Sequence, residues 1–575
     1  MSYREEYNRW LGAAALTNEE KNELNAIHDN DDEIKDRFFG NLKFGTAGLR
    51  GIMGAGINRM NIHTVRHATQ GLATLIAGMG KAARERGVAV CMDWRHNSDI
   101  FAKEAASVLA GNEIKVYLFD APRPTPELSF AVRAIECIAG INITASHNPK
   151  EYNGYKVYWE DGAQLPPDHA EVVAKTIAKT DIFSEIKLMD YDRALKKGLI
   201  TLIGEEVDES FLFHVLEMSI NREAVGQVAD TLKIVYTPFH GTGAQLVPEA
   251  LRRLGLKHIL CEPEQMRPDG GFSTVKSPNP ENKESFKLAI ELAKRENAEL
   301  IIGTDPDADR VGIVVLKSGG EYVPLTGNQV GVLLLDYIIN ARKSAGTLPE
   351  NPSAIKTIVT TEMARAAAEA NGVRMFDTFT GFKFMAEKIK ELETAGSHEY
   401  LLAFEESYGY LMGGFCRDKD AVTASMMIAE LAAYCKTRGK TLYEAMRDLY
   451  EKYGSYAEET INIVMPGIDG LEKMEKLMSG LRENPPESIA GTEVLRVRDY
   501  LGGKIFDFKS RETSETEISG SNVLYFELSD DTRFIIRPSG TEPKIKIYIL
   551  THADSMEECG ERISKYRAAA EKLKE

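Results

Sequence analysis

The chain has 575 residues, a length that predicts about four domains of ordinary size. Its hydrophobic fraction of 43% and charged fraction of 27% are typical of globular proteins, and no apolar run is long enough to cross a bilayer. The formal net charge of -17 argues against a nucleic-acid or membrane partner, because both polymers are anionic.

The N-terminal segment and the cysteines indicate where the protein is located and whether disulfides or zinc stabilise it. Residues 1–16 are charged in their first half and lack the apolar core of a signal peptide, so we expect a soluble, cytoplasmic protein. The six cysteines are scattered without a CxxC pair, which favours buried reduced thiols over a disulfide framework or a zinc site.

Short β-branched segments alternate with helical patterns along most of the chain, which predicts α/β layering. The first cycle has strands expected over Val88–Asp93, Ile114–Asp120 and Ile138–Ala145. The second has them over Leu232–Phe239, His258–Glu262, Glu299–Asp305 and Val311–Leu316. The third has them over Ile355–Thr361, Val373–Asp377 and Tyr400–Phe404. The tail has consecutive strands over Glu459–Val464, Val494–Tyr500, Val523–Leu528, Arg533–Arg537 and Lys544–Leu550, then a helix near Ser555–Leu573.

Turn residues and changes in composition place domain boundaries near Gly204, Ser318 and Tyr453. The predicted domains are residues 1–204, 205–318, 319–453 and 454–575. The polar stretch Ser510–Ser521 is expected to be a mobile loop of the last domain. The predicted fold is three α/β domains followed by one α+β domain.

A serine follows the predicted strand Ile138–Ala145, in the sequence TASHNP at residues 144–149. A serine hydroxyl becomes a good nucleophile or phosphate carrier when a proton acceptor or a cation lies close to it. The segment Asn153–Lys156 is expected to be a flexible turn that brings a lysine back toward this loop. A Ser-His pair also fits an ordinary turn, so Ser146 alone does not decide the function.

Three aspartates at alternate positions follow a second apolar strand, in the sequence DPDADR at residues 305–310. Carboxylates spaced in this way can converge on a hard divalent cation such as Mg²⁺. An EF-hand loop is excluded because Arg310 and Leu316 stand where it requires glycine and glutamate. A solvated acidic turn is disfavoured because clustered like charges repel one another without a cation. The loop predicts an open magnesium site with room for a phosphoryl oxygen.

Four further segments carry groups suited to sugars or phosphates, although each also fits a polar turn by itself. FEESYG (residues 404–409) places a carboxylate and a hydroxyl two positions apart, as contacts to vicinal sugar hydroxyls would require. RPSGTEPK (residues 537–544) combines an arginine, small hydroxyls and exposed backbone N–H groups, as in a phosphate cradle. GTAGLRG (residues 45–51) supplies an arginine in a tight turn, and HGTG (residues 240–243) is interpreted as a structural helix start.

In this order, the segments resemble the α-D-phosphohexomutase superfamily (phosphoglucomutase and phosphomannomutase). TASHNP and DPDADR are specific as a pair, RPSGTEPK is an independent match, and the resemblance covers Lys43–Ile547. FGTAGLRG and FEESYG look most like the branch of bacterial phosphoglucomutases and phosphopentomutase-type enzymes. The resemblance implies three similar mixed-sheet α/β domains and a C-terminal α+β domain, like the TATA-box-binding protein, around a central cleft.

The resemblance also implies a catalytic site. Ser146 would be phosphorylated, and Mg²⁺ would be held by a phosphoserine oxygen together with Asp305, Asp307 and Asp309. The other matched catalytic positions are Arg50, His147, Lys156 and Lys419, of which the last three are alternative proton-transfer groups. The matched substrate-binding positions are Arg310, Thr380, Gly381, Glu405, Ser407, Arg537, Ser539, Gly540 and Thr541.

The implied activity interconverts glucose 1-phosphate and glucose 6-phosphate through a phosphoserine and a bisphosphorylated sugar. Glucose 1,6-bisphosphate would be the activator, and the enzyme would be a monomer or a homodimer. Pro306 and Ala308 stand where relatives often carry glycines, but the carboxylates of the metal loop are intact. Phe404 replaces a glycine and the GEMSGH form of dual-specificity enzymes is absent, so mannose or pentose phosphates are alternative substrates. A metal-dependent phosphatase and a non-catalytic sugar-phosphate sensor are the rival functions.

Overall fold

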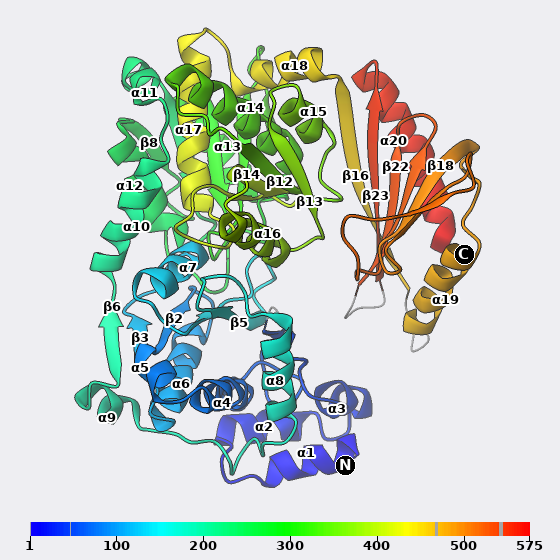
Figure 1. Cartoon of the computed structure of the whole chain (residues 1–575). Helices are drawn as coiled ribbons and strands as arrows, with labels where there is room; N and C mark the ends of the chain where they lie inside the picture. The colour runs from blue at the N-terminus through cyan, green and yellow to red at the C-terminus, as the bar shows by residue number, and fades with distance from the viewer. Residues whose placement is uncertain (1, 46–47, 466–469, 540–543, 575) are drawn as a thin grey trace. The chain divides into compact units, whose positions relative to one another are not determined.

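The computed structural model describes residues 2–45, 48–465, 470–539 and 544–574, and the chain folds into two compact units (Figure 1). Unit 1 comprises Met1–Gly327 and Ser407–Leu442, and unit 2 comprises Asn328–Glu406 and Tyr443–Glu575. None of the helices in these described ranges is both long enough and apolar enough to span a membrane. Each unit is built around its own β-sheets.

Three short helices open unit 1: α1 (Tyr3–Gly12), α2 (Asn18–Ala26) and α3 (Asp31–Phe38). Ser2 and Thr17 start the first two with capping boxes, in which the hydroxyl and a glutamate three residues later satisfy each other's backbone N–H groups. The apolar faces of the three helices share a small core made of Tyr7, Trp10, Leu24, Ile34 and Phe38.

A six-stranded mixed sheet forms the first α/β domain, with the strand order β1-β5-β4-β2-β3-β6. Its strands are β1 (Leu49–Ile52), β2 (Val88–Met92), β3 (Val116–Phe119), β4 (Ala139–Ile143), β5 (Tyr152–Trp159) and β6 (Ile200–Ile203). Strand β5 runs antiparallel to β1 and β4, whereas β4, β2, β3 and β6 are parallel. The helices are α4 (Ile62–Gly78), α5 (Lys81–Arg86), α6 (Ser98–Gly111), α7 (Thr125–Ala134), α8 (Pro167–Ile177) and α9 (Tyr191–Lys196).

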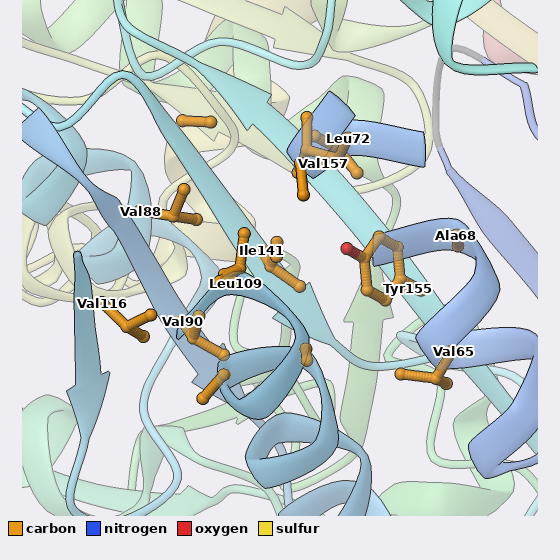
Figure 2. Close-up of a cluster of buried hydrophobic side chains, with 14 of the residues drawn as sticks. Val65, Ala68, Leu72, Val88, Val90, Leu109, Val116, Ile141, Tyr155 and Val157 are labelled. Atoms are coloured by element: carbon orange, nitrogen blue, oxygen red, sulfur yellow. The ribbon is translucent and has the colours of Figure 1, made fainter. Parts of the chain in front are cut away.

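The core of this domain lies between the sheet and helices α4 and α6 (Figure 2). Strands β2 and β4 are buried at every position, as expected for parallel strands covered on both faces. Each large aliphatic side chain buried there contributes about 1.5–3 kcal/mol to stability. The rigid sheet fixes the loops that leave its strands. The packed side chains include Val88, Val90, Ile141 and Val157 of the sheet, Leu72 of α4 and Leu109 of α6.

Two local predictions in this domain are wrong. Asn153–Lys156, expected to be a flexible turn, lies inside strand β5. Arg50, expected in a tight turn, lies on β1 opposite Gly154, just after the bridge between Gly45 and Gly48. A Cβ at Gly154 would lie 2.4 Å from the carbonyl oxygen of residue 144, so this glycine permits close packing of the backbone and does not mark a turn.

A five-stranded sheet forms the second α/β domain of unit 1, with the order β11-β10-β9-β7-β8. Strands β7, β8 and β9 are parallel, and β10 is antiparallel to β9 and β11. Its strands are β7 (Lys233–Thr237), β8 (His258–Cys261), β9 (Leu300–Thr304), β10 (Val311–Leu316) and β11 (Tyr322–Leu325). Its helices are α10 (Glu205–Glu217), α11 (Arg222–Val228), α12 (Gly243–Leu254), η1 (Lys283–Phe286), α13 (Lys287–Glu296) and α17 (Ala421–Thr437).

Unit 2 contains the third α/β domain, in which β12 (Pro352–Thr357) pairs in parallel with β13 (Arg374–Thr378) and β14 (Glu399–Glu405). The short strand β15 (Gly409–Leu411) belongs to unit 1. The helices of this region are α14 (Gly327–Ala345), α15 (Met363–Glu369), α16 (Phe382–Ala395) and α18 (Leu442–Tyr453).

The C-terminal domain of unit 2 is an antiparallel sheet with the order β16-β23-β22-β21-β18-β19-β20, in which β17 also pairs with β18. The expected loop Ser510–Ser521 is wrong in part, because it contains β20, which pairs with β19. The predicted α+β character is confirmed. The strands are β16 (Ser455–Val464), β17 (Ser488–Ile489), β18 (Thr492–Asp499), β19 (Lys504–Asp507), β20 (Thr513–Glu515), β21 (Leu524–Leu528), β22 (Arg533–Pro538) and β23 (Lys544–Ala553). The helices are α19 (Gly470–Glu483), α20 (Met556–Glu571) and η2 (Lys572–Lys574).

Candidate active site

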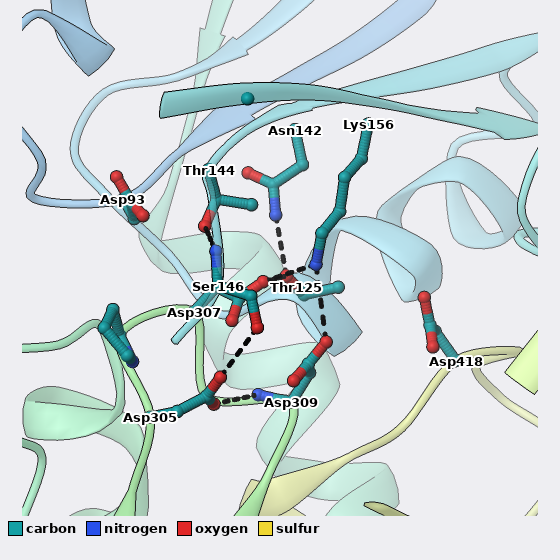
Figure 3. A network of polar contacts seen from close by, with 12 residues as sticks. Asp93, Thr125, Asn142, Thr144, Ser146, Lys156, Asp305, Asp307, Asp309 and Asp418 are labelled. Carbon is teal, nitrogen blue, oxygen red and sulfur yellow. Dashed lines mark hydrogen bonds and ion pairs between the residues drawn. The ribbon is translucent and has the colours of Figure 1, made fainter. Parts of the chain in front are cut away.

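Ser146 lies in the loop that follows β4, and its side chain points at the aspartate loop (Figure 3). Its Oγ donates a hydrogen bond to Asp305 Oδ2 at 2.9 Å and lies 3.3 Å from His147 Nδ1. The backbone at Ser146 is left-handed, with φ of +53°, and its N–H donates to Thr144 Oγ1 at 2.9 Å. Ser146 is 3% exposed, so its hydroxyl is buried and faces the Asp305 carboxylate.

The aspartate loop connects β9 to β10, which pair directly as a hairpin. Asp305, Asp307 and Asp309 are almost fully buried, and one oxygen of each lies within 4.8 Å of the others. Ala308 between them has φ of +49°, which explains why a glycine would also suit this position. Gly241 packs directly against this loop. A Cβ at this position would lie 2.6 Å from the Cα atom of residue 306, so only glycine permits the close approach.

The oxygens of the three aspartates divide between protein contacts and open positions. Asp305 Oδ1 accepts the N–H groups of Asp309 and Arg310, at 3.1 and 3.0 Å. Asp307 Oδ1 and Asp309 Oδ1 are buried, and no described residue donates a hydrogen bond to either. Two buried aspartates that each leave one oxygen unsatisfied, beside a third aspartate and a serine hydroxyl, fit a hard divalent cation such as Mg²⁺.

Two lysines contact the second oxygens of the cluster. Lys156 Nζ, from β5, lies 2.6 Å from Asp307 Oδ2 and 3.4 Å from Asp309 Oδ2. Lys419 Nζ lies 3.2 Å from Asp309 Oδ2 and 3.1 Å from Asp418 Oδ1. Burial alone would lower the pKa of Lys156, but the charges of Asp307 and Asp309 outweigh it and raise that pKa. Lys156 is therefore charged and supplies a fixed positive group at the site.

His147 and Arg50 also belong to the surroundings of the serine loop. Burial, and then the charges of Arg310 and Arg50, lower the pKa of His147 to about 2, so the imidazole is neutral. Arg50 donates from Nη1 to Asn148 Oδ1 at 3.0 Å. Arg310 donates from Nη1 to the carbonyl of Ser407 and to Glu281 Oε1, both at 3.1 Å. Cationic and neutral donors thus surround the serine and the aspartates within unit 1.

Known proteins share both this sequence pattern and the layered domains. Three profiles for phosphoglucomutase/phosphomannomutase match the chain: alpha/beta/alpha domain I at residues 41–182, domain II at 209–319 and domain III at 326–453. A phosphoglucomutase of Staphylococcus aureus (strain N315) is 37% identical over 536 residues, which are 93% of this chain and 94% of that protein. The chain belongs to the phosphoglucomutase/phosphomannomutase family.

Solved structures support the fold. A phosphoglucomutase/phosphomannomutase family protein from Burkholderia thailandensis has a TM-score of 0.65 at 19% identity, covering 92% of this chain and 97% of that chain. The phosphoglucomutase parafusin from Paramecium has a TM-score of 0.67 at 18% identity, covering 93% and 94%. The predicted superfamily and fold class are confirmed, and the chain is a phosphotransferase of the isomerase class.

The remaining family positions that the sequence predicted lie in unit 2, apart from Ser407. Glu405 ends β14 and is buried, and Thr380 and Gly381 lie between β13 and α16, with φ of +113° at the glycine. Arg537 lies near the end of β22, and Ser539 follows that strand. Gly540 and Thr541 lie outside the described residues.

Sequence reasoning missed residues that hold these family positions in place. Thr125 Oγ1 donates to Asp307 Oδ2 at 2.8 Å and accepts from Asn142 Nδ2 at 2.7 Å. Tyr158 donates to Asp418 Oδ2 at 2.9 Å, on the opposite side of the cluster. Thr125 is followed by Pro126, a pair that is typical of a helix start, so its sequence signal pointed to capping and not to a carboxylate.

Proposed function

We propose that this chain is a phosphoglucomutase that interconverts glucose 1-phosphate and glucose 6-phosphate with Ser146 as phosphate carrier. The observation that carries the proposal is the contact between Ser146 Oγ and Asp305 Oδ2 inside a buried aspartate cluster flanked by Lys156. A serine at a cation site is suited to carry a phosphoryl group, since the cation and the lysine offset the charge of the phosphoryl oxygens. The relatives named phosphoglucomutase support the choice of sugar.

A carrier serine solves a geometric problem. The O1 and O6 atoms of one sugar cannot both be in line with the same phosphorus, so direct transfer in one step is excluded. In the proposed sequence, the P–Oγ bond of phosphorylated Ser146 breaks while O6 of glucose 1-phosphate forms a bond to phosphorus and loses its proton. The resulting bisphosphate turns over, and Oγ takes the phosphoryl group from O1, which recovers a proton. The serine then carries phosphate again, and glucose 6-phosphate is released.

The residues around Ser146 would divide the work. Asp305, Asp307, Asp309 and a phosphoserine oxygen would hold Mg²⁺, which when bound offsets charge on the transferring group. Lys156 stays charged beside Asp307, which suits charge stabilisation better than proton acceptance. His147 and Lys419 therefore stay as the alternative proton-transfer groups in this proposal.

The sugar and its second phosphate would be held by the family positions outside the aspartate cluster. Glu405, Ser407, Thr380 and Gly381 would bind sugar hydroxyls in both orientations. Arg537 with Ser539, Gly540 and Thr541 would bind the phosphate that is not reacting, and Arg310 is a further substrate-binding position in unit 1. We infer domain boundaries at residues 1–204, 205–318, 319–453 and 454–575, and glucose 1,6-bisphosphate as the priming activator.

A coupled assay tests the proposal. The purified chain is primed with glucose 1,6-bisphosphate and Mg²⁺, and turnover of glucose 1-phosphate, mannose 1-phosphate and ribose 1-phosphate is compared. We expect the highest kcat/KM for glucose 1-phosphate and loss of mutase turnover in Ser146→Ala. Release of inorganic phosphate without isomerisation would identify a phosphatase, and binding without turnover would identify a sensor.

A further inference from the structure

The loop that carries Ser146 adopts a backbone conformation that needs support. A non-glycine residue with φ of +53° is uncommon, and such conformations are unfavourable by about 1–3 kcal/mol. They persist only where the surrounding structure fixes them. The bond from Ser146 N–H to Thr144 Oγ1 fixes the amide side of the residue. Its carbonyl side is fixed by a residue from the loop after β2.

That residue is Arg95, whose guanidinium contacts the backbone of the serine loop, residues 146–152. Within the described residues, its side chain donates four hydrogen bonds, and all of them end on main-chain carbonyls between residues 146 and 152. Arginine suits this task because its planar fork presents five donors in a fixed geometry. Nη2 donates to the carbonyls of Ser146 and Asn148, both at 2.5 Å, and Nη1 donates to those of Pro149 and Tyr152 at 2.8 and 3.1 Å.

Arg95 is itself held rigidly. Its Nε lies 3.2 Å from Asp93 Oδ2, and neither side chain is exposed at all. Asp93 Oδ1 accepts the Arg95 N–H at 2.9 Å and the Ser98 hydroxyl at 2.8 Å. The ring of Phe272, from the second α/β domain, packs against the guanidinium with 4.8 Å to its centroid. The guanidinium therefore cannot shift without breaking a buried network.

A buried arginine often serves the fold alone, and unit 1 contains such a case for comparison. Arg123 donates to both oxygens of Asp208 at 2.6 and 3.0 Å, and both side chains are buried. None of the bonds that Arg123 makes within the described chain reaches residues 146–152. Arg95 and Arg123 are thus both buried and both paired with an aspartate. Of the two, Arg95 contacts the serine loop and Arg123 does not.

We propose that Arg95 is the positioning residue of the phosphate-carrying loop. By fixing the carbonyl of Ser146, it fixes the backbone of this residue, and so the direction of the bond from Cα to the Cβ that carries Oγ, in both the free and the phosphorylated states. The same oxygen can then give the phosphoryl group to one sugar oxygen and take it back from another. This inference rests on the proposed carrier role of Ser146.

A loosened loop should affect the two acceptors of the phosphoryl group differently. Transfer to a bound sugar hydroxyl requires alignment of Oγ, phosphorus and a fixed oxygen, and a displacement of about 1 Å can lower such a rate about 100-fold. Water is mobile and can approach a displaced phosphoserine from its new direction. Loss of the Arg95 contacts should therefore lower the ratio of transfer to hydrolysis, with little change in sugar binding.

The experiment compares Arg95→Lys, Arg123→Lys and the unmodified chain with Mg²⁺ present. Each is loaded from glucose 1,6-bisphosphate, and loading is followed by intact mass. Three quantities are measured: kcat and KM for glucose 1-phosphate, the rate of phosphoserine loss without sugar, and the thermal midpoint. For Arg95→Lys we expect kcat to fall about 100-fold with KM within about threefold, while hydrolysis per phosphoserine is unchanged or faster. Arg123→Lys should lose stability without these changes.

Each outcome supports or overturns the inference. If Arg95→Lys does not take up phosphate from glucose 1,6-bisphosphate, this result also supports the inference. Loading is the transfer from the sugar bisphosphate to Ser146, which is the reverse of the transfer to the sugar. An unchanged kcat, or a loss confined to KM, overturns it. If Arg95→Lys does not fold, Phe272→Leu is tested instead: it leaves the donors of Arg95 in place but removes the ring that packs against the guanidinium. The contacts to the serine loop should then loosen and kcat should fall about threefold to tenfold; an unchanged kcat in that variant overturns the inference. If the unmodified chain neither loads phosphate on Ser146 nor turns over any sugar, the proposed function itself fails.

Discussion

Lys156 of unit 1 and Lys356 of unit 2 are both buried, but they lie in ion networks of opposite kinds. In unit 2, Lys356 of β12 is fully buried, with Nζ 2.8 Å from Glu362 Oε1 and 3.1 Å from Asp377 Oδ1. Arg365 pairs with the same two carboxylates. The charges of Lys356 and Arg365 outweigh burial and lower the pKa of Glu362 to about 2. Lys356 and Arg365 face Glu362 and Asp377, so the charges of these four side chains balance, and we call this network complete. Asp377 Oδ1 accepts no hydrogen bond from the described residues but is in contact with the Lys356 ammonium.

The network of unit 1 is incomplete. Lys156 contacts Asp307 and Asp309 through their Oδ2 atoms, but the Oδ1 atoms stay buried without a hydrogen-bond donor from any described residue. Burial, and then the charges of Asp307 and Asp309, raise the pKa of Asp305 well above its usual range. A buried lysine therefore does not identify a catalytic site. Carboxylate oxygens left open beside a nucleophile do.

The largest expected effect comes from removing one charge of the incomplete network. Asp305→Asn should lower mutase turnover about 1000-fold or more, because the variant loses a proposed metal ligand that also accepts the Ser146 hydrogen bond. Without metal, the same variant should be about 1 kcal/mol more stable at alkaline pH, where Asp305 would otherwise have to ionise in a buried site beside two carboxylates. Thermal unfolding with and without Mg²⁺ measures both effects. A metal-induced rise in the midpoint equal to that of the unmodified chain would contradict the open-site interpretation.

The complete network should respond in the opposite way. Lys356→Met leaves Glu362 and Asp377 with one cation between them, and we expect a loss of about 3–5 kcal/mol in the free energy of unfolding. Turnover per folded molecule should stay within about threefold, as long as the fold is retained. Urea unfolding and an activity titration of the native fraction check this. The double variant Lys356→Met/Asp377→Asn should recover part of the stability, and a loss of turnover without a loss of stability would reverse the assignment.

A moderate effect is expected at the residue that orients the open carboxylate. Thr125→Val removes the hydroxyl that donates to Asp307 Oδ2, so this carboxylate is held less firmly with Oδ1 toward the cation. We expect metal affinity to fall about tenfold, as for other partners of metal ligands. Mn²⁺ binding followed by electron paramagnetic resonance measures it without relying on turnover. Thr125→Ser keeps the donor and is the matched control, and equal affinities in the two variants would remove the assigned role.

The sequence predicted the features that depend on residues close together in the chain. The alternation of strands and helices predicted three α/β domains, and the spacing of Asp305, Asp307 and Asp309 predicted carboxylates that converge, as they do in the structure. What it could not predict are contacts between distant segments. Thr125 reaches Asp307 across 182 positions, and Arg95 reaches the serine loop across 51. Neither residue type in its own segment distinguishes a positioning role from a helix start or a surface charge.

A third buried cluster, also in unit 1, consists of Glu127, Asp208 and Arg123. In this cluster we expect a proton on Glu127 to play the part that a cation plays in the other two. No described residue other than a carboxyl group offers a hydrogen bond to either oxygen of the fully buried Glu127. Its neighbour Asp208 is charged and paired with Arg123. Burial, and then the Asp208 carboxylate, raise the pKa of Glu127 well above its usual range. A protonated Glu127 can donate to Asp208, which reconciles the buried position with the lack of another donor.

The sign of the pH dependence follows from this raised pKa. A carboxyl group with a folded pKa above its unfolded value of 4.5 stabilises the fold fully below that value, and the contribution is lost as pH rises through the folded pKa. Asp208 has a lowered pKa, so its contribution changes only below its unfolded value of 3.8, in a separate window. Glu127→Gln keeps a donor at every pH. We therefore expect the variant to match the unmodified chain near pH 4.5 and to be more stable by about 1 kcal/mol near pH 8. Urea unfolding at the two pH values measures this, and equal stability differences at both would show that Glu127 is not completed by a proton.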